Sequence, residues 1–74
     1  MASNDIKRTE YALEEYYNGK FDNQVDIFYH LDDAYYFAKH SNIKEYVIRA
    51  IYYNGNENEI GTEIVYDSKI RKEN

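Results

Sequence analysis

The sequence contains no cysteine, no proline and no tryptophan, and it has only three glycines. Without cysteine the chain can form neither a disulfide nor a Cys/His zinc site. No apolar run approaches the roughly 20 residues that a membrane-spanning helix needs, so we expect no membrane partner. The opening residues MASNDIKR also lack the apolar core of a signal peptide. We therefore expect a cytoplasmic protein.

The charge is acidic and unevenly spread. The formal net charge is −5, and the segment from Glu10 to Ala38 holds seven carboxylates against Lys20 alone. Such a field repels nucleic acid and attracts basic surfaces. We expect no direct DNA or RNA binding and a basic protein surface as the partner. The alternative is that the acidic surface only keeps a tyrosine-rich domain soluble.

The length of 74 residues fits a single small domain spanning 1–74. A core of this size gives a thin stability margin, and without disulfides the chain needs either unusually good packing or self-association. Residues 1–5 and 68–74 are polar and charged, and we expect them to be flexible.

The strongest local pattern is a hairpin formed by Ile43–Tyr53 and Glu59–Asp67 around the turn sequence NGNEN. Asn54 and Gly55 both tolerate positive φ. In the first strand, Tyr46, Ile48, Ala50 and Tyr52 alternate with Ile43, Val47, Ile51 and Tyr53. Both faces are thus partly apolar, which predicts a central strand covered by a helix on one side and by a partner or its own tyrosines on the other. The second strand alternates more cleanly, as at a sheet edge.

The N-terminal segment Ile6–Tyr17 has two interpretations. As a helix it would begin after Asp5 and stop at Asn18-Gly19. As a strand it would turn at Asn18-Gly19, in a type I′ geometry, into a partner strand over Lys20–Tyr29. The strand interpretation is favoured because apolar residues alternate after the turn. Its register requires a bulge or a longer loop near Asp22 and Asn23.

The segment Leu31–His40 is the clearest helix. Leu31, Ala34, Tyr35 and Ala38 form an apolar stripe, acidic residues occupy the first turn and basic residues the last. Its small alanines permit close approach to a sheet, and Asn42 can end it. The predicted fold is therefore α+β, a ββαββ order in which an antiparallel sheet of about four strands carries one short helix on one face. The alternative is αβαββ, with a helical first segment.

No catalytic, metal or cofactor site is expected. The only histidines, His30 and His40, lie at opposite ends of a three-turn helix, roughly 15 Å apart. The adjacent carboxylates Glu14-Glu15 and Asp32-Asp33 diverge on either a strand or a helix. The three glycines are isolated and belong to turns or a strand, which does not form a phosphate-binding loop. The sequence therefore predicts a protein that is not an enzyme.

Tyrosine next to carboxylate is the recurring feature of the sequence. Tyrosine gives large contact area at low entropic cost, and carboxylates beside aromatic rings suit arginine and lysine. The alternative is that most of these tyrosines line the core. The candidate partner-binding residues are Glu14, Glu15, Tyr16, Tyr17, Asp22, Asp26, Asp32, Asp33 and Tyr36. The candidate self-association residues are Val47, Ile51 and Tyr53.

The succession EYYNGKF, an apolar strand, HLDDAYYFAKH and a strand hairpin resembles small acidic proteins encoded by phages and mobile elements of low-GC bacteria. This resemblance covers Tyr11 to Tyr66 and carries over no site residue. It implies an inhibitor of host defence, of the anti-CRISPR or anti-restriction type. We expect a non-enzymatic module that occludes a basic, nucleic-acid-binding surface of a host protein. The alternative is a small homodimer with a structural or regulatory role.

Overall fold

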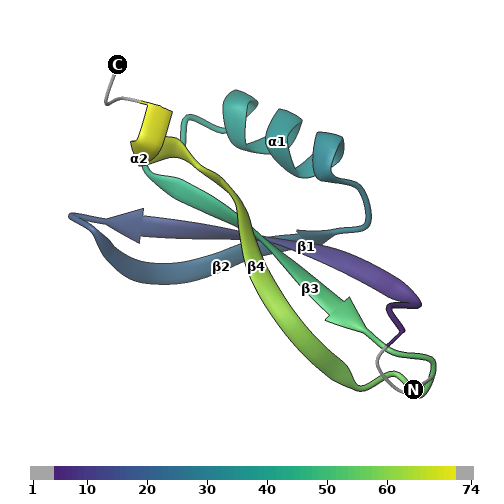
Figure 1. The fold of residues 1–74 in the computed structure, drawn as a ribbon. Helices are drawn as coiled ribbons and strands as arrows, with labels where there is room; N and C mark the ends of the chain where they lie inside the picture. The colour runs from purple at the N-terminus through teal and green to yellow at the C-terminus, as the bar shows by residue number, and fades with distance from the viewer. Residues whose placement is uncertain (1–4, 72–74) are drawn as a thin grey trace.

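The computed structural model describes residues 5–71, which form one antiparallel sheet of four strands with a helix on one face (Figure 1). The elements in chain order are β1 (Arg8–Tyr17), β2 (Lys20–Phe28), α1 (Leu31–His40), β3 (Tyr46–Tyr53), β4 (Glu59–Asp67) and α2 (Ser68–Arg71). The strand order is β2-β1-β3-β4, so the first strands of the two hairpins pair at the centre. The predicted α+β class and four-stranded antiparallel sheet are confirmed, and the first segment is a strand.

The first hairpin turns at Asn18 and Gly19, whose φ angles of 53° and 82° are those of the expected type I′ turn. Tyr16 pairs with Phe21 while Glu15 pairs with Asn23, which leaves Asp22 as an extra residue in β2. The expected bulge near Asp22 is therefore present. A second shift lies between Leu13 and Glu14, whose partners are Asp26 and Gln24 and leave Val25 extra.

The second hairpin differs from the sequence prediction at two points. Its positive φ of 66° occurs at Glu57, and not at Asn54 or Gly55. Asn54 is buried instead, and its side-chain oxygen accepts the backbone N–H groups of Asn56 at 2.9 Å and Asn58 at 3.1 Å. The asparagine thus organises the loop through its side chain, as in an Asx turn.

The start of the central strand also differs. β3 begins at Tyr46, so Ile43 lies outside it and does not share the face of Val47 as predicted. Ile43 packs against the core cluster that contains Leu13 and Ala38.

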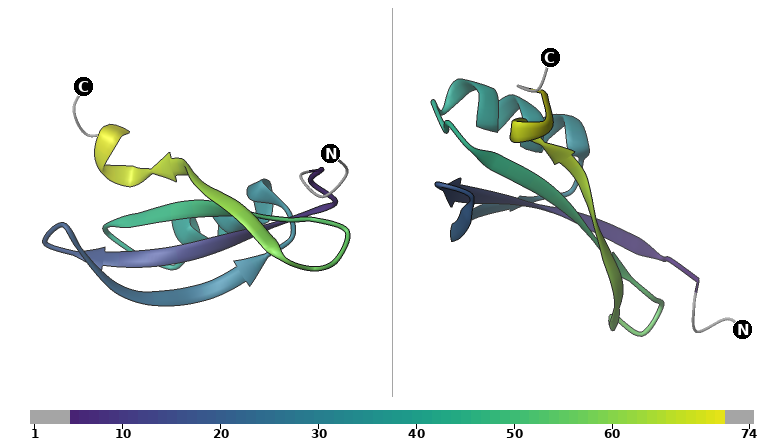
Figure 2. Two further views of the ribbon diagram at one scale, coloured as in Figure 1. Left: turned by 60° about the horizontal axis from the view of Figure 1, so that its bottom comes forward. Right: turned by 60° about the vertical axis from the view of Figure 1, so that its left-hand side comes forward.

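Helix α1 lies along one face of the sheet, as the views in Figure 2 show. Its bounds match the prediction, and Ala34 and Ala38 are its buried residues, which lets the helix approach the strands closely. Asn42 follows the helix with a φ of 60°, a left-handed conformation that ends the helix. The sheet therefore has a covered face beneath α1 and an open face on the opposite side.

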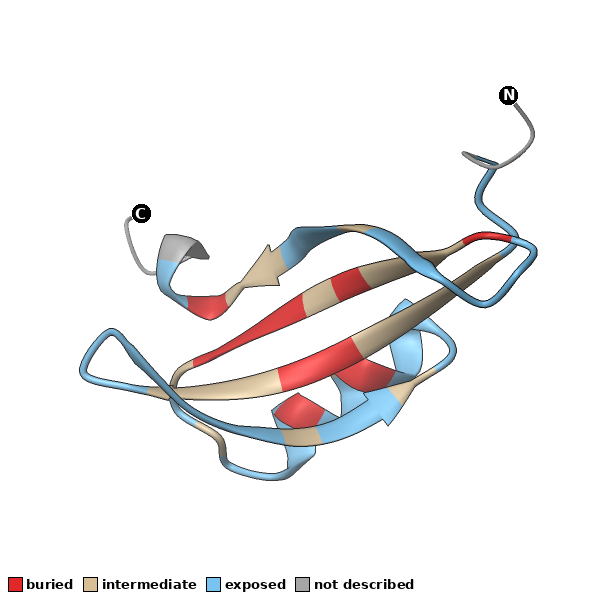
Figure 3. Ribbon diagram, turned by 90° about the horizontal axis from the view of Figure 1, so that it is seen from below, coloured by how far each residue is buried: buried red, intermediate tan, exposed pale blue. Residues whose placement is uncertain are grey.

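The core lies between α1 and the middle of β1 and β3, where Figure 3 shows most of the buried positions. Leu13 and Ile48 are fully buried and lie opposite each other on adjacent strands, and Tyr66 of β4 pairs with Ile48. Burial of each aliphatic side chain contributes about 1.5–3 kcal/mol. The centre of the sheet thus holds the fold together while both edge strands stay more exposed.

The sequence predicts a flexible C-terminal segment from residue 68 onward. In the structure Ser68–Arg71 form a single helical turn, and Ser68 is buried. The remaining parts of the predicted flexible ends, residues 1–4 and 72–74, lie outside the described residues.

Candidate functional site

The outward side of α1 presents tyrosine beside carboxylate. Because Ala34 and Ala38 face the sheet, Tyr36, which is two residues from each, lies on the opposite side of the helix and points away from the sheet. Tyr36 is 66% exposed on the helix, and Tyr29, just before it, is 67% exposed. Together with Asp32 and Asp33, these tyrosines form what we call the α1 surface: Tyr29, Asp32, Asp33 and Tyr36.

Asp32 and Asp33 lie in the first turn of α1, on two different sides of the helix. Both occupy the first turn, where the helix dipole favours negative charge. Asp32 lines a groove shared with β4. Asp33 lies four residues before Phe37, whose ring is 5.5 Å from Phe28 of β2. The adjacent carboxylates therefore diverge, as the sequence predicted.

The first hairpin holds further exposed candidates. Tyr17 is 72% exposed at its tip. Asp22 is the bulged residue of β2, and the Asp26 carboxylate accepts its neighbour's N–H, that of Ile27, at 2.8 Å. Glu15 accepts a hydrogen bond from the Asn23 amide at 3.2 Å. These groups are divided between the edge strand β2 and the end of the central strand β1.

Two candidate residues belong to the open face. Nε of Arg49 donates to both carboxylate oxygens of Glu14 at 3.2 Å, so this carboxylate is already paired. The ring of Tyr16 meets that of Phe21 edge-on, with centroids 6.0 Å apart. The nine partner-binding candidates therefore do not form one continuous face. The α1 surface gathers three of them: Asp32, Asp33 and Tyr36.

The three self-association candidates all lie on the open face. Within a single molecule, however, neighbouring side chains already bury much of their surface. Val47 is only 5% exposed, and Ile51 and Tyr53 are half-buried. The guanidinium of Arg8 stacks over the Tyr53 ring at 4.2 Å. Burial and the nearby Glu10 carboxylate raise the pKa of Tyr53 above its ordinary value. A second copy would therefore gain little area at Val47.

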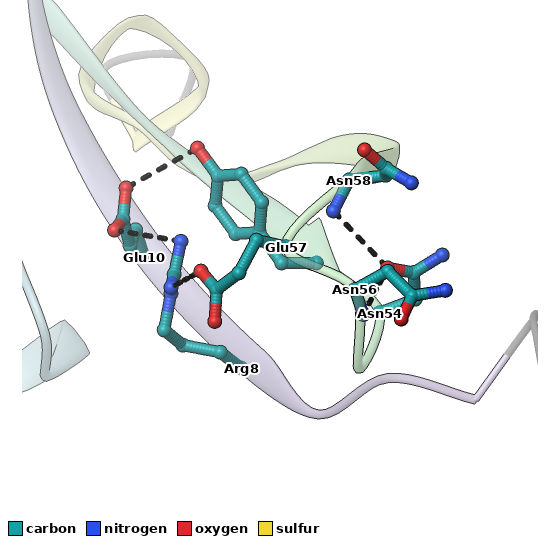
Figure 4. Close-up of polar contacts among 7 residues, drawn as sticks. Arg8, Glu10, Asn54, Asn56, Glu57 and Asn58 are labelled. Carbon is teal, nitrogen blue, oxygen red and sulfur yellow. Dashed lines mark hydrogen bonds and ion pairs between the residues drawn. The ribbon is translucent and has the colours of Figure 1, made fainter.

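A network of charged and amide groups ties the start of β1 to the β3–β4 turn (Figure 4). Arg8 pairs with Glu10 at 3.3 Å and with Glu57 of the turn. Its hydrogen bond to Glu57 raises the pKa of the Arg8 guanidinium. The Tyr53 hydroxyl donates to Glu10 at 3.3 Å. The charged groups at this end of the open face therefore pair with one another, and we assign this cluster a structural role.

A small cavity of about 140 Å³ lies where the turn after β1 meets the ends of β3 and β4. The Glu45 carboxylate makes two polar contacts beside this cavity: it pairs with Nζ of Lys69 at 3.2 Å and accepts a hydrogen bond from the Gly19 N–H at 3.1 Å. The groups that line it are Tyr16, Gly19, Glu45, Tyr46, Val47, Ile64, Asp67 and Lys69. Between residues 5 and 71, no group of three His, Cys, Asp or Glu side chains could hold a metal ion.

A second, larger groove of about 240 Å³ separates α1 from β4. Tyr35 and Tyr66 meet in its wall, with ring centroids 5.1 Å apart. The lining residues are Leu31, Asp32, Tyr35, Val65 and Tyr66. Sequence reasoning missed this groove because it placed Leu31 and Tyr35 in the apolar stripe on the sheet and could not see the bulge that brings Val65 beside Tyr66.

Comparison with known proteins adds no relative to this picture. No protein-family model matches the sequence, and no curated protein and no solved structure gives a significant match. Among the described residues, no helix is both long and apolar enough to cross a membrane.

Proposed function

We propose that this chain is a non-enzymatic protein-binding module that occludes a basic, nucleic-acid-binding surface of a host protein, in the manner of a phage-type inhibitor. The observation that carries the proposal is the α1 surface: Tyr36 on the helix and Tyr29 just before it are about two-thirds exposed, and Asp32 and Asp33 occupy the first helical turn. Tyrosine is enriched at protein–protein interfaces. Carboxylates next to them attract arginine and lysine.

The distribution of charge supports the same surface. On the open face, Arg8 pairs with Glu10 and Glu57, and Arg49 pairs with Glu14, so two positive charges offset most of the charge of these three carboxylates. The negative charge that remains available to a partner is therefore concentrated away from the open face, on α1 and the edge strands. Charged side chains at the rim of an interface affect mainly the association rate and the specificity, whereas exposed aromatic rings supply contact area.

Capture from a lysate of the natural host tests the proposal. The tagged full chain is expected to retain a basic nucleic-acid-binding protein at low salt and to release it at about 0.5 M salt. The retained protein, once identified and purified, should lose its nucleic acid when this chain is added. The double variant Tyr29→Ala/Tyr36→Ala should retain at most about one tenth as much.

A matched control separates the tyrosines from general charge. Asp5→Asn removes an exposed carboxylate that precedes β1 and should leave capture unchanged. An empty capture at low salt contradicts the proposal. So does a stable dimer in light scattering without any captured protein, which would instead support the homodimer alternative.

A further inference from the structure

β4 is an edge strand with apolar side chains in the open. It pairs with β3 on one side only, because it is last in the order β2-β1-β3-β4. Ile60, Ile64 and Val65 are each more than one-third exposed along it. The unpaired backbone groups of an edge strand are a template for another extended segment. β4 is therefore open to the addition of a further strand.

A bulge connects this edge to the groove beneath α1. Ile48 pairs with Tyr66 and Arg49 with Ile64, which leaves Val65 as an extra residue. In a regular strand Val65 and Tyr66 would face opposite sides, but here both line the groove. The groove volume of about 240 Å³ is below the roughly 300–1,000 Å³ of small-molecule sites. It suits a side-chain anchor of a bound segment better than a cofactor.

The charge of β4 selects the kind of segment that could bind. The strand EIGTEIVYD carries Glu59, Glu63 and Asp67 and no lysine or arginine, and Asp32 lies on the groove. Two copies paired edge to edge through β4 would bring these carboxylates together, which opposes self-pairing. A lysine- or arginine-rich strand meets complementary charge instead.

We propose that β4 accepts an extended basic segment of a partner protein as a fifth strand, with one apolar side chain of that segment seated in the groove between α1 and β4. This inference rests on the proposed function and names the part of the partner that the chain grips. Main-chain pairing supplies affinity and the groove supplies side-chain selection, as in other strand-addition complexes.

The probe is a short synthetic peptide that alternates lysine and valine, titrated into the isotope-labelled full chain and followed by NMR. Amide shifts should change along Glu59–Asp67, and methyl shifts should change at Leu31 and Val65. A peptide that alternates glutamate and valine should produce none of these changes, and added salt should weaken binding of the lysine peptide.

Two matched pairs of variants test the charge and the groove separately. Asp32→Lys should weaken peptide binding about tenfold, whereas Asp22→Lys, at an exposed position on the opposite edge strand β2, should change it less than about twofold. Val65→Lys should abolish the methyl shift at Leu31. Ile60→Lys, at the other bulge of β4 and with nearly equal exposure, should preserve that shift.

The inference is overturned if the lysine peptide does not bind, if its shifts map to β2 or the open face, or if Asp22→Lys weakens binding as much as Asp32→Lys. Concentration-dependent shifts along β4 without peptide, together with a dimer in light scattering, would assign the edge to a second copy and also overturn it. If capture of a basic protein depends on Tyr29 and Tyr36 but not on Asp32, that result supports the proposed function and overturns this inference.

Discussion

The hydroxyl oxygen of Ser68 accepts the backbone N–H of Tyr46 at 2.9 Å, and the contact is buried. It joins the first residue of α2 to the first residue of β3, at a point where the ladder to β4 begins with Val47 and Asp67. The helical turn that follows β4 is therefore attached to the central strand by a hydrogen bond that its sequence does not reveal.

Replacing Ser68 with alanine should lower the free energy of unfolding by about 1–2 kcal/mol, because the buried N–H of Tyr46 loses this acceptor. Chemical denaturation monitored by circular dichroism measures the change. Ser41→Ala, at an exposed serine after α1, should change stability by less than about 0.5 kcal/mol. Equal effects of the two substitutions would contradict a role for the Ser68 hydroxyl.

The type I′ turn predicts different costs at two glycines. Gly19 has a φ of 82°, and an added Cβ would lie 3.4 Å from Nζ of Lys69. Gly19→Ala should therefore destabilise the chain by about 1 kcal/mol, mostly through backbone strain. Gly61→Ala should be neutral or stabilising, because a Cβ there meets no atom within 4 Å. Thermal melting of both variants compares them, and a larger loss at Gly61 would argue against this turn geometry.

The close approach of α1 to the sheet should make Ala34 intolerant of larger residues. Ala34→Leu forces extra methyl groups into a fully buried position and should cost about 1–3 kcal/mol. Tyr36→Leu, on the outward side of the same helix, should cost less than about 0.5 kcal/mol. Denaturant titration of both variants measures the difference, and tolerance of leucine at Ala34 would mean that the helix stands farther from the strands.

Stability should decline in alkali through the tyrosines of β3. The Tyr52 hydroxyl donates to Glu63 at 2.8 Å, and this hydrogen bond raises the pKa of Tyr52 above the ordinary value of 10.0. A raised pKa in the folded state means that the unfolded chain releases the proton first. The contribution is therefore complete below about pH 10 and is lost as the pH rises through the folded pKa.

The measurement is the denaturation midpoint at a series of pH values above about 9, for the parent chain and for Tyr52→Phe. The parent should lose stability more steeply than Tyr52→Phe. Glu63→Gln should flatten the dependence as well, because it removes the charged acceptor. Identical slopes for all three chains would refute the assignment to the Tyr52–Glu63 pair.

Local patterns were enough to predict most of the secondary structure. The bounds Leu31–His40 follow from an apolar stripe with acidic and basic ends, and the turn at Asn18-Gly19 follows from residues that accept positive φ. The bulge at Asp22 could be inferred because a strict register would have paired Leu13 wrongly. Each of these features depends on residues close together in the sequence.

The features that sequence reasoning missed depend on partners far away in the chain. Arg49 neutralises Glu14, 35 residues earlier, and this pairing removes Glu14 from any acidic surface offered to a partner. The bulge at Val65 is set by the pairing of β3 with β4, so alternation within β4 alone could not show that Val65 and Tyr66 share a groove. The alternation of apolar residues is a property of a single strand, whereas the register depends on how two strands pair.

From the topology we expect the central pairing of β1 with β3 to be the slow step of folding. Each hairpin closes over a short turn, but the middle ladder joins Arg8 to Tyr53 and Glu15 to Tyr46. That step must close the loop from residue 16 to residue 45 before it gains its contacts. Docking of two preformed hairpins, with α1 condensing between them, should therefore limit the folding rate.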